Sequence, residues 1–154
     1  QKVKELQAII DKMDNNKDSF WIPRKGYTYF CLCGGGQIWE TEWLDSPMDY
    51  RRYSCGNVYR NRLEVETKKE NKRIHQEIKK IAHELNNGRV IDWKNTSQPK
   101  YSIYYCYSDG SLYQATEMLC KSPNAVYCLS NAFLEHVKKS ISDADLIRYA
   151  KEGI

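Results

Sequence analysis

The sequence predicts an α+β fold in which two similar hairpin–strand–helix units form antiparallel sheet packed by helices, preceded by an N-terminal helix. Strand-forming residues flank a glycine-containing turn at 26–39 and again at 100–113, which is the pattern of a β-hairpin. Helical periodicity follows each hairpin. At 154 residues the chain is long enough for one domain with a single core. We therefore expect 20–88 and 89–154 to be two units of one domain.

The segment 1–19 predicts a helix followed by a polar linker. Its apolar residues recur at steps of three and four, at Val3, Leu6, Ile10 and Met13, so 1–14 has one narrow apolar stripe. We favour a helix that docks on the sheet. The alternative is a short coiled-coil seam through which two copies of the chain would dimerise.

The two hairpins align with each other without gaps, which indicates an internal repeat. Tyrosine matches tyrosine, glycine matches glycine and apolar residues match apolar ones, as in the pairs Tyr27/Tyr101, Gly36/Gly110 and Ile38/Leu112. A Ser-Pro pair follows each hairpin, and then comes a short third strand, Val58-Tyr59 in the first copy and Val126-Tyr127 in the second.

Helices are predicted at 62–86, 131–140 and after Ser142. Asn61 and Ser130 are favourable N-caps for the first two helices. Asn87-Gly88 ends the first, and Asp145 stands at the capping-box position after Ser142. The apolar face of the first helix consists of Ile74, Ile78, Ile81, Ala82 and Leu85.

The sequence favours no enzyme class, cofactor or metal. Its three histidines lack the H-E-x-x-H spacing of zinc hydrolases, and no G-x-S-x-G motif is present. Gly34-Gly35-Gly36 precedes a strand, so it predicts a hairpin turn rather than a phosphate cradle. The six cysteines lack the paired C-x₂₋₄-C spacing of structural zinc sites, so we expect reduced thiols, several of them buried.

The net charge and the hydropathy of the chain limit which partners and which cell compartment we expect. The net charge of +4 is too modest to predict nucleic-acid binding alone, and it argues against a mimic of DNA. No run approaches the roughly 18 apolar residues of a membrane span, and the first residues do not resemble a secretory signal. We therefore expect a cytosolic protein that does not bind membranes.

The strongest candidate for a binding site is a segment that the second copy lacks. Residues inserted in a repeat tend to form a surface loop, and here arginines alternate with tyrosines, the composition of binding hot spots. An ordinary surface is an equal alternative, and Arg52 pairing with Asp49 to hold the loop is another. The candidate residues of this loop are Tyr50, Arg51, Arg52, Tyr53, Asn57, Arg60 and Arg62.

A second candidate is a basic face on the 62–86 helix. Lys69, Arg73 and Lys80 lie on one side of this helix, but glutamates interrupt them at 70, 77 and 84. We favour a solvated helix face here and retain the three residues as secondary binding candidates.

The aromatic and glycine residues resemble a known family in their order. The pattern runs Trp21-x-Pro23-x-x-Gly26-x-x-Tyr29, Trp43, Arg52-Tyr53-x-x-Gly56-Asn57, Trp93 and Leu146-Ile147-Arg148-Tyr149. It is similar to that of small, mostly uncharacterised accessory proteins of Firmicutes phages and prophages. The chain departs from this family in Cys31, Cys33, the triple glycine and the polar stretch 67–73.

The resemblance implies a phage or prophage protein that acts in the host bacterial cytoplasm by binding. By analogy with other small phage proteins, it implies an anti-CRISPR-like inhibitor that makes stoichiometric contacts with a host defence protein such as a CRISPR effector. The alternative is a protein that binds nucleic acid or a nucleotide signal through the Arg/Tyr loop.

Overall fold

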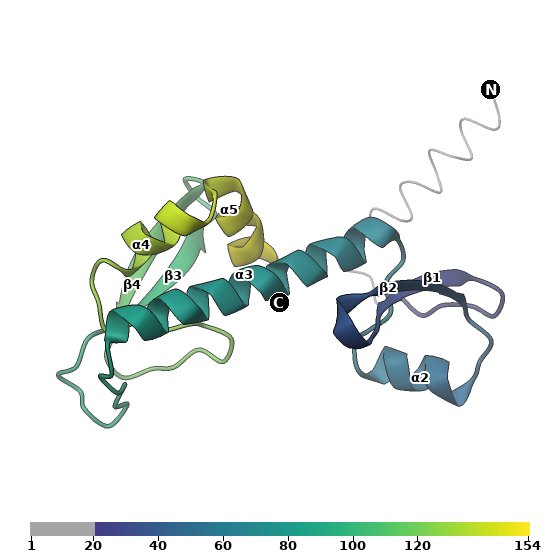
Figure 1. The fold of residues 1–154 in the computed structure, drawn as a ribbon, viewed down its shortest axis with the longest axis horizontal. Coiled ribbons are helices and arrows are strands. Elements are labelled where there is room, and N and C mark those ends of the chain that lie inside the picture. Colours follow the sequence, from purple (N-terminus) through teal and green to yellow (C-terminus); the bar gives the residue numbers. More distant parts are fainter. Residues whose placement is uncertain (1–20) are drawn as a thin grey trace. The chain divides into compact units, whose positions relative to one another are not determined.

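The computed structural model describes residues 21–154, and it confirms the α+β class. The expected helix at 1–14, and with it the dimer seam, lies outside the described residues. The described chain forms two compact units. The aromatic unit comprises 21–31 and 39–60, and the helical unit comprises 32–38 and 61–154. Figure 1 labels the elements.

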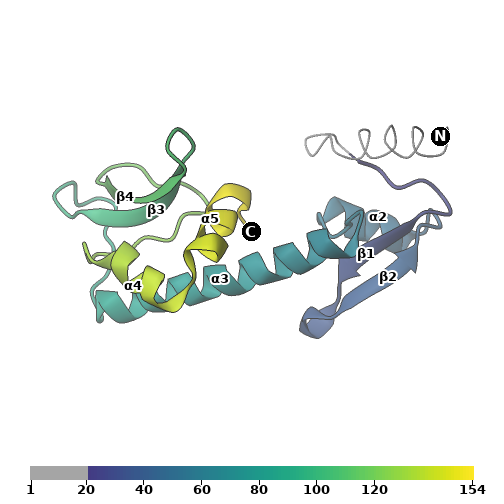
Figure 2. The same cartoon turned by 90° about the horizontal axis from the view of Figure 1, so that it is seen from above.

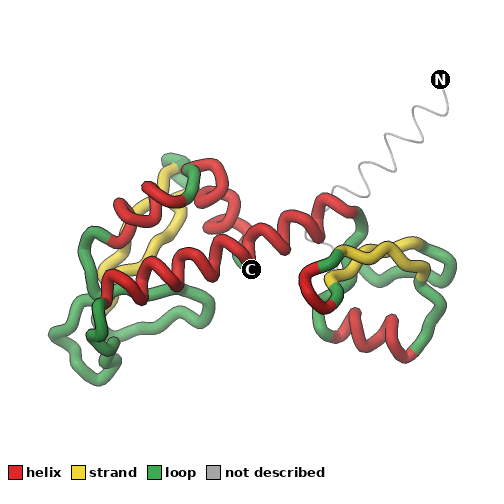
Figure 3. Tube along the Cα trace, in the orientation of Figure 1, coloured by secondary structure: helices red, strands yellow, loops and turns green. Residues whose placement is uncertain are grey.

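The aromatic unit contains one short helix and the first hairpin apart from its tip, 32–38, which groups with the helical unit. Strands β1 (Thr28–Leu32) and β2 (Ile38–Glu42) pair through the expected glycine turn, in which Gly35 and Gly36 both have a φ of 78°. Only glycine adopts this left-handed backbone without strain, so the prediction of a hairpin turn is confirmed. Helix α2 (Pro47–Ser54) follows the hairpin, where a surface loop was expected; Figure 3 shows its helical conformation.

Helix α2 begins with a capping box. The side chain of Ser46 accepts a hydrogen bond from the amide of Asp49, and the carboxylate of Asp49 accepts one from the amide of Ser46. Pro47 occupies the first helical position, where a missing N–H has no consequence. The expectation of a loop at this point was therefore wrong, because a Ser-Pro-x-Asp sequence starts a helix.

The helical unit contains the second hairpin and three helices. Strands β3 (Lys100–Cys106) and β4 (Ser111–Glu117) pair antiparallel, with Tyr104 opposite Tyr113. Helices α4 (Phe133–Ser140) and α5 (Asp143–Glu152) each contact both this sheet and the long helix α3 (Arg62–Asn86), as Figures 1 and 2 show. Helix α3 was expected to cover the first hairpin, but its apolar face packs in this unit.

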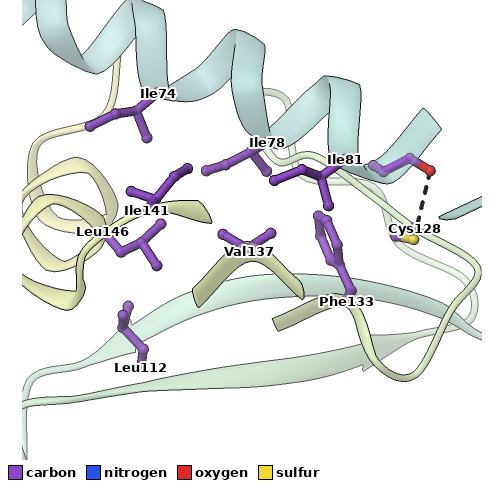
Figure 4. Packing of buried hydrophobic residues seen from close by; sticks show 10 residues of the cluster. Ile74, Ile78, Ile81, Leu112, Cys128, Phe133, Val137, Ile141 and Leu146 are labelled. Carbon is purple, nitrogen blue, oxygen red and sulfur yellow. Dashed lines mark hydrogen bonds between the residues drawn. The ribbon is translucent and has the colours of Figure 1, made fainter. Parts of the chain in front are cut away.

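The core of the helical unit forms where α3, α4, α5 and β4 meet (Figure 4). Its buried side chains are Ile74, Ile78, Ile81, Ala82, Leu112, Cys128, Phe133, Val137, Ile141 and Leu146. Each fully buried aliphatic or aromatic side chain contributes roughly 1.5–3 kcal/mol to stability. The predicted apolar face of 62–86 is thus confirmed, apart from a half-buried Leu85 at its edge.

The helix ends test the predicted caps. Asn61 caps α3 by accepting a hydrogen bond from the amide of Glu64, and Asn87 ends it in a left-handed conformation. Ser142 caps α5 as expected. The prediction for Ser130 was wrong, because α4 begins at Phe133 and the amide of Leu134 is capped instead by the side chain of Gln114 on β4.

The repeat is visible in the strands and stops at the helices. In both copies the first strand of the hairpin forms one antiparallel bridge at or next to the expected third strand. Phe30 pairs with Tyr59 of the expected Val58-Tyr59, and Tyr101 pairs with Cys128, the residue after the expected Val126-Tyr127. The second copy has no helix at the position of α2, since 118–130 contains turns and the one bridge residue. The shared element is therefore the hairpin with its bridged segment.

Candidate functional site

The aromatic unit has a tryptophan at its centre. Trp43 is 1% exposed, and the rings of Tyr29, Tyr50 and Tyr53 pack edge-on against it, with centroid distances of 5.7, 5.2 and 6.2 Å. The indole Nε1 of Trp43 donates a hydrogen bond to Asp45. Two tyrosines of the expected binding loop, Tyr50 and Tyr53, therefore pack against the central tryptophan of their own unit, Tyr53 half-buried and Tyr50 still largely exposed.

A buried polar network connects α2 to the hairpin. The carboxylate of Asp49, which is 3% exposed, accepts hydrogen bonds from the Tyr29 hydroxyl at 2.7 Å, from the Ser46 hydroxyl and amide, and from the amide of Leu44 at 3.0 Å. Arg52 donates from Nη1 to the Tyr29 hydroxyl at 2.9 Å. Arg52 thus reaches Asp49 through Tyr29, which agrees with the structural alternative for this arginine.

The pKa of Asp49 reflects this network. Burial desolvates the carboxylate and acts to raise the pKa, but the hydrogen bonds from Tyr29, Ser46 and Leu44 outweigh it and lower the pKa from 3.8 to about 2. The same contacts act on Tyr29, whose pKa is raised chiefly by burial.

We expect the aromatic unit to lose stability as the pH falls from about 4 to about 2, because the pKa of Asp49 is lower in the folded state. Above pH 4 the carboxylate is ionised in both states and its contribution is complete; below the folded pKa this contribution is lost. Tryptophan emission during urea unfolding measures this, since three of the four tryptophans, Trp21, Trp39 and Trp43, belong to the aromatic unit. An Asp49→Asn variant should show a flatter profile in this window, and an equal slope would contradict the assignment.

The remaining loop candidates occupy three different settings. The backbone N–H of Asn57 donates a hydrogen bond to the backbone carbonyl of Arg52, just after the C-terminal end of α2. Arg60 lies over the ring of Trp21, 5.6 Å from its centroid. Arg62, at the start of α3, pairs with Glu66 at 2.8 Å, and the two side chains are largely exposed. Each of these three residues therefore has a recorded partner of its own.

The basic face of α3 is exposed, as expected. Arg73 pairs with Glu70 at 2.7 Å, and this ion pair lowers the pKa of Glu70 and raises that of Arg73. Lys69 and Lys80 are exposed on the same helix. A paired, solvated face of this kind is common on helices and gives no specific site.

The structure reveals an exposed, largely apolar surface that the sequence predicted only in part. Leu44, Met48 and Tyr50 surround the first turn of α2 and are 56%, 49% and 53% exposed. Arg51 lies one turn after Met48 and is also exposed. We call these four residues the α2 surface. Tyr50 and Arg51 were among the predicted loop candidates, whereas Leu44 and Met48 were not. Met48 could have been grouped with Arg51 only by recognising the helix, because their shared face follows from its period.

A pocket of about 460 Å³ lies in the helical unit. His75 and Lys79 of α3 line one side, and Trp93, Lys121, Asn124 and Tyr127 from two connecting segments line the others. No sequence pattern groups these residues, since they come from three separated stretches of chain.

The cysteines differ in exposure more than expected. Cys31 and Cys128 are buried, Cys33 and Cys106 are half-buried, and Cys55 and Cys120 are exposed. Within residues 21–154, no three His, Cys, Asp or Glu side chains are grouped so that they could hold a metal ion. None of the described helices combines the length and apolar character needed to cross a membrane.

Comparison of the chain with protein-family models, with curated proteins and with solved structures finds no match.

Proposed function

We propose that this chain is a binding protein of a phage or prophage that inhibits a bacterial defence system by stoichiometric contact through the α2 surface. The supporting observation is the concentration of exposed apolar and aromatic side chains around the first turn of α2. Met, Tyr and Arg are enriched where proteins bind one another, and a cluster of exposed large apolar residues typically marks such a site.

The first turn of α2 and the ring of Tyr50 are held in place within the α2 surface. The capping box and the Asp49 network hold the first turn of α2 against the hairpin, and Tyr50 is held by Trp43 and by a hydrogen bond to Asp45 at 3.2 Å. Preformed side chains lose little conformational entropy when a partner binds, so a small surface of this kind can bind tightly.

A protein partner has more support than nucleic acid at this site. Of the arginines in the segment, Arg52 bonds to Tyr29, Arg60 stacks on Trp21 and Arg62 pairs with Glu66. A nucleic-acid surface would instead direct several cations to the phosphates. The choice of a defence protein such as a CRISPR effector as the target rests on the phage-family resemblance.

We expect a Met48→Ala/Arg51→Ala variant to bind its target about thirtyfold more weakly, a loss of about 2 kcal/mol, while its fold is unchanged. The chain is first used to capture partners from nuclease-treated lysate of a CRISPR-containing Firmicutes host. Affinity for the purified partner is then measured by calorimetry. Expression of the chain in the same host should raise the plaque count of a phage that CRISPR targets.

The matched control is Met118→Ala/Arg89→Ala, which removes the same residue types from exposed positions of the helical unit. This control should bind and protect phage as the unmodified chain does. Equal binding by the α2 variant would exclude the α2 surface. Capture that disappears on nuclease treatment would favour the nucleic-acid alternative, and an unchanged plaque count would contradict the defence role.

A further inference from the structure

The pocket of the helical unit has a lining that is unusual in its charge. Lys79 and Lys121 are both exposed at its rim, and among the described residues no Asp or Glu lines it. Neither lysine is paired with a carboxylate anywhere in 21–154. Two ammonium groups without a countercharge at one opening attract an anion, and phosphate is the anion that lysine most often binds.

The lining of the pocket combines aromatic and apolar side chains with polar ones. Tyr127 is a buried residue of this lining, and the half-buried Trp93 packs edge-on against it with a centroid distance of 4.8 Å and an interplanar angle of 83°. Asn124 adds an amide that both donates and accepts hydrogen bonds. Indole surface suits the stacking of a nucleobase, and an amide suits its polar edge.

Hydrogen bonds hold the walls of the pocket in place. The hydroxyl of Tyr127 accepts a hydrogen bond from the amide of Ser122 at 2.7 Å, which folds 121–127 into a fixed turn. The ammonium group of the buried Lys100 donates to the carbonyls of Asn95 and Met118 and lies 5.2 Å from the ring centre of Trp93. The site is therefore preformed, which is usual for small-molecule pockets.

His75 adds a neutral donor or acceptor beside Lys79. The two residues are one helical turn apart on α3, and burial together with the charge of Lys79 lowers the pKa of His75. Nδ1 of His75 is 2.6 Å from the hydroxyl of Tyr149. When this hydroxyl donates to Nδ1, the other ring nitrogen carries the proton and can donate to a phosphate oxygen.

We infer that this pocket binds a free nucleotide, with its phosphates between Lys79 and Lys121 and its base against Trp93. The volume of about 460 Å³ falls in the range of roughly 300–1,000 Å³ that holds such small molecules. The site is independent of the α2 surface, so each proposal can fail without the other.

The test is calorimetric titration of the full chain with ATP, GTP, CTP and UTP. Tripolyphosphate and adenosine serve as the phosphate-only and ring-only probes, and a short single-stranded oligonucleotide represents nucleic acid. At least one nucleotide should bind, and a Lys79→Gln/Lys121→Gln variant should bind it at least about tenfold more weakly. The control Lys72→Gln/Lys138→Gln loses the same charge from exposed positions outside the pocket and should stay within about twofold.

Three results would overturn the inference. The first is no binding of any of the four nucleotides at millimolar concentration. The second is an equal loss of affinity in both lysine variants, which would indicate only the net charge of the chain. The third is tripolyphosphate or the oligonucleotide binding as tightly as the best nucleotide, which would indicate an anion or nucleic-acid site. Circular dichroism of both variants checks that the fold is retained.

Discussion

An Asp49→Asn substitution should lower the free energy of unfolding of the aromatic unit by about 3 kcal/mol, because a buried acceptor with four hydrogen-bond donors is lost. The carboxylate accepts from the Tyr29 and Ser46 hydroxyls and from the amides of Leu44 and Ser46. An asparagine has one oxygen in place of two, and its NH₂ group would face these donors. In either orientation of the asparagine amide, the NH₂ group replaces one of the two acceptor oxygens, so either the Tyr29 hydroxyl or the donors of Leu44 and Ser46 lose their acceptor in a buried site.

Urea unfolding followed by tryptophan emission measures this loss. The matched control is Asp45→Asn, which makes the same chemical change at an exposed position. Asp45 accepts from Trp43 and Tyr50 and has a φ of 56°, a conformation that asparagine tolerates well. This control should cost less than about 1 kcal/mol, because its remaining carbonyl oxygen can accept both bonds. Equal effects in the two variants would show that the Asp49 network is not the main polar support of this unit.

Local chemistry determined which elements could be predicted. The hairpins follow from strand-forming residues on either side of glycine, and the caps at Asn61, Asn87 and Ser142 follow from short-range hydrogen bonds. Helix α2 was also encoded locally, by Ser46, Pro47 and Asp49, but the absence of an equivalent in the second copy made the segment look like an insertion.

The partners of an element were much harder to predict. An apolar stripe shows which face of α3 is buried, but it does not show which other element covers this face. The chain places it against α4 and α5, whose own stripes are too short to form a core alone. Likewise the start of α4 depends on Gln114, a residue from a strand almost twenty positions earlier.

The candidate site shows why composition alone is ambiguous. Tyrosine and arginine are common both in binding hot spots and in small aromatic cores. In this segment some of them pack inside the unit and others are exposed. Tyr53 and Arg52 face Trp43 and Tyr29, whereas Met48 and Arg51 face solvent. Only the helical period of α2 separates these two sets.

Lys100 is the most unusual buried residue of the helical unit. Its side chain is completely buried, and its ammonium group joins the segment before β3, through Asn95, to the end of β4, through Met118. The ring of Trp93 lies over the charge at 5.2 Å. Buried lysines are rare unless they are paired, and here two carbonyls and one aromatic ring replace a carboxylate.

We expect Lys100→Ala to lower the free energy of unfolding of the helical unit by about 4 kcal/mol, because the substitution leaves two carbonyls without a donor and a cavity beside Trp93. Lys100→Met keeps the length of the side chain and removes only the charge and its hydrogen bonds, so about 2 kcal/mol should be lost. Far-ultraviolet circular dichroism during urea unfolding is the measurement, because α3, α4 and α5 belong to this unit and contain most of the helical residues between 21 and 154.

Lys94→Ala is the control, since Lys94 is exposed in the same connecting segment and its substitution should cost less than about 0.5 kcal/mol. A methionine variant as stable as the unmodified chain would show that Lys100 acts through packing alone. If the alanine variant loses no more stability than the control, the segment before β3 and the end of β4 are held together without Lys100.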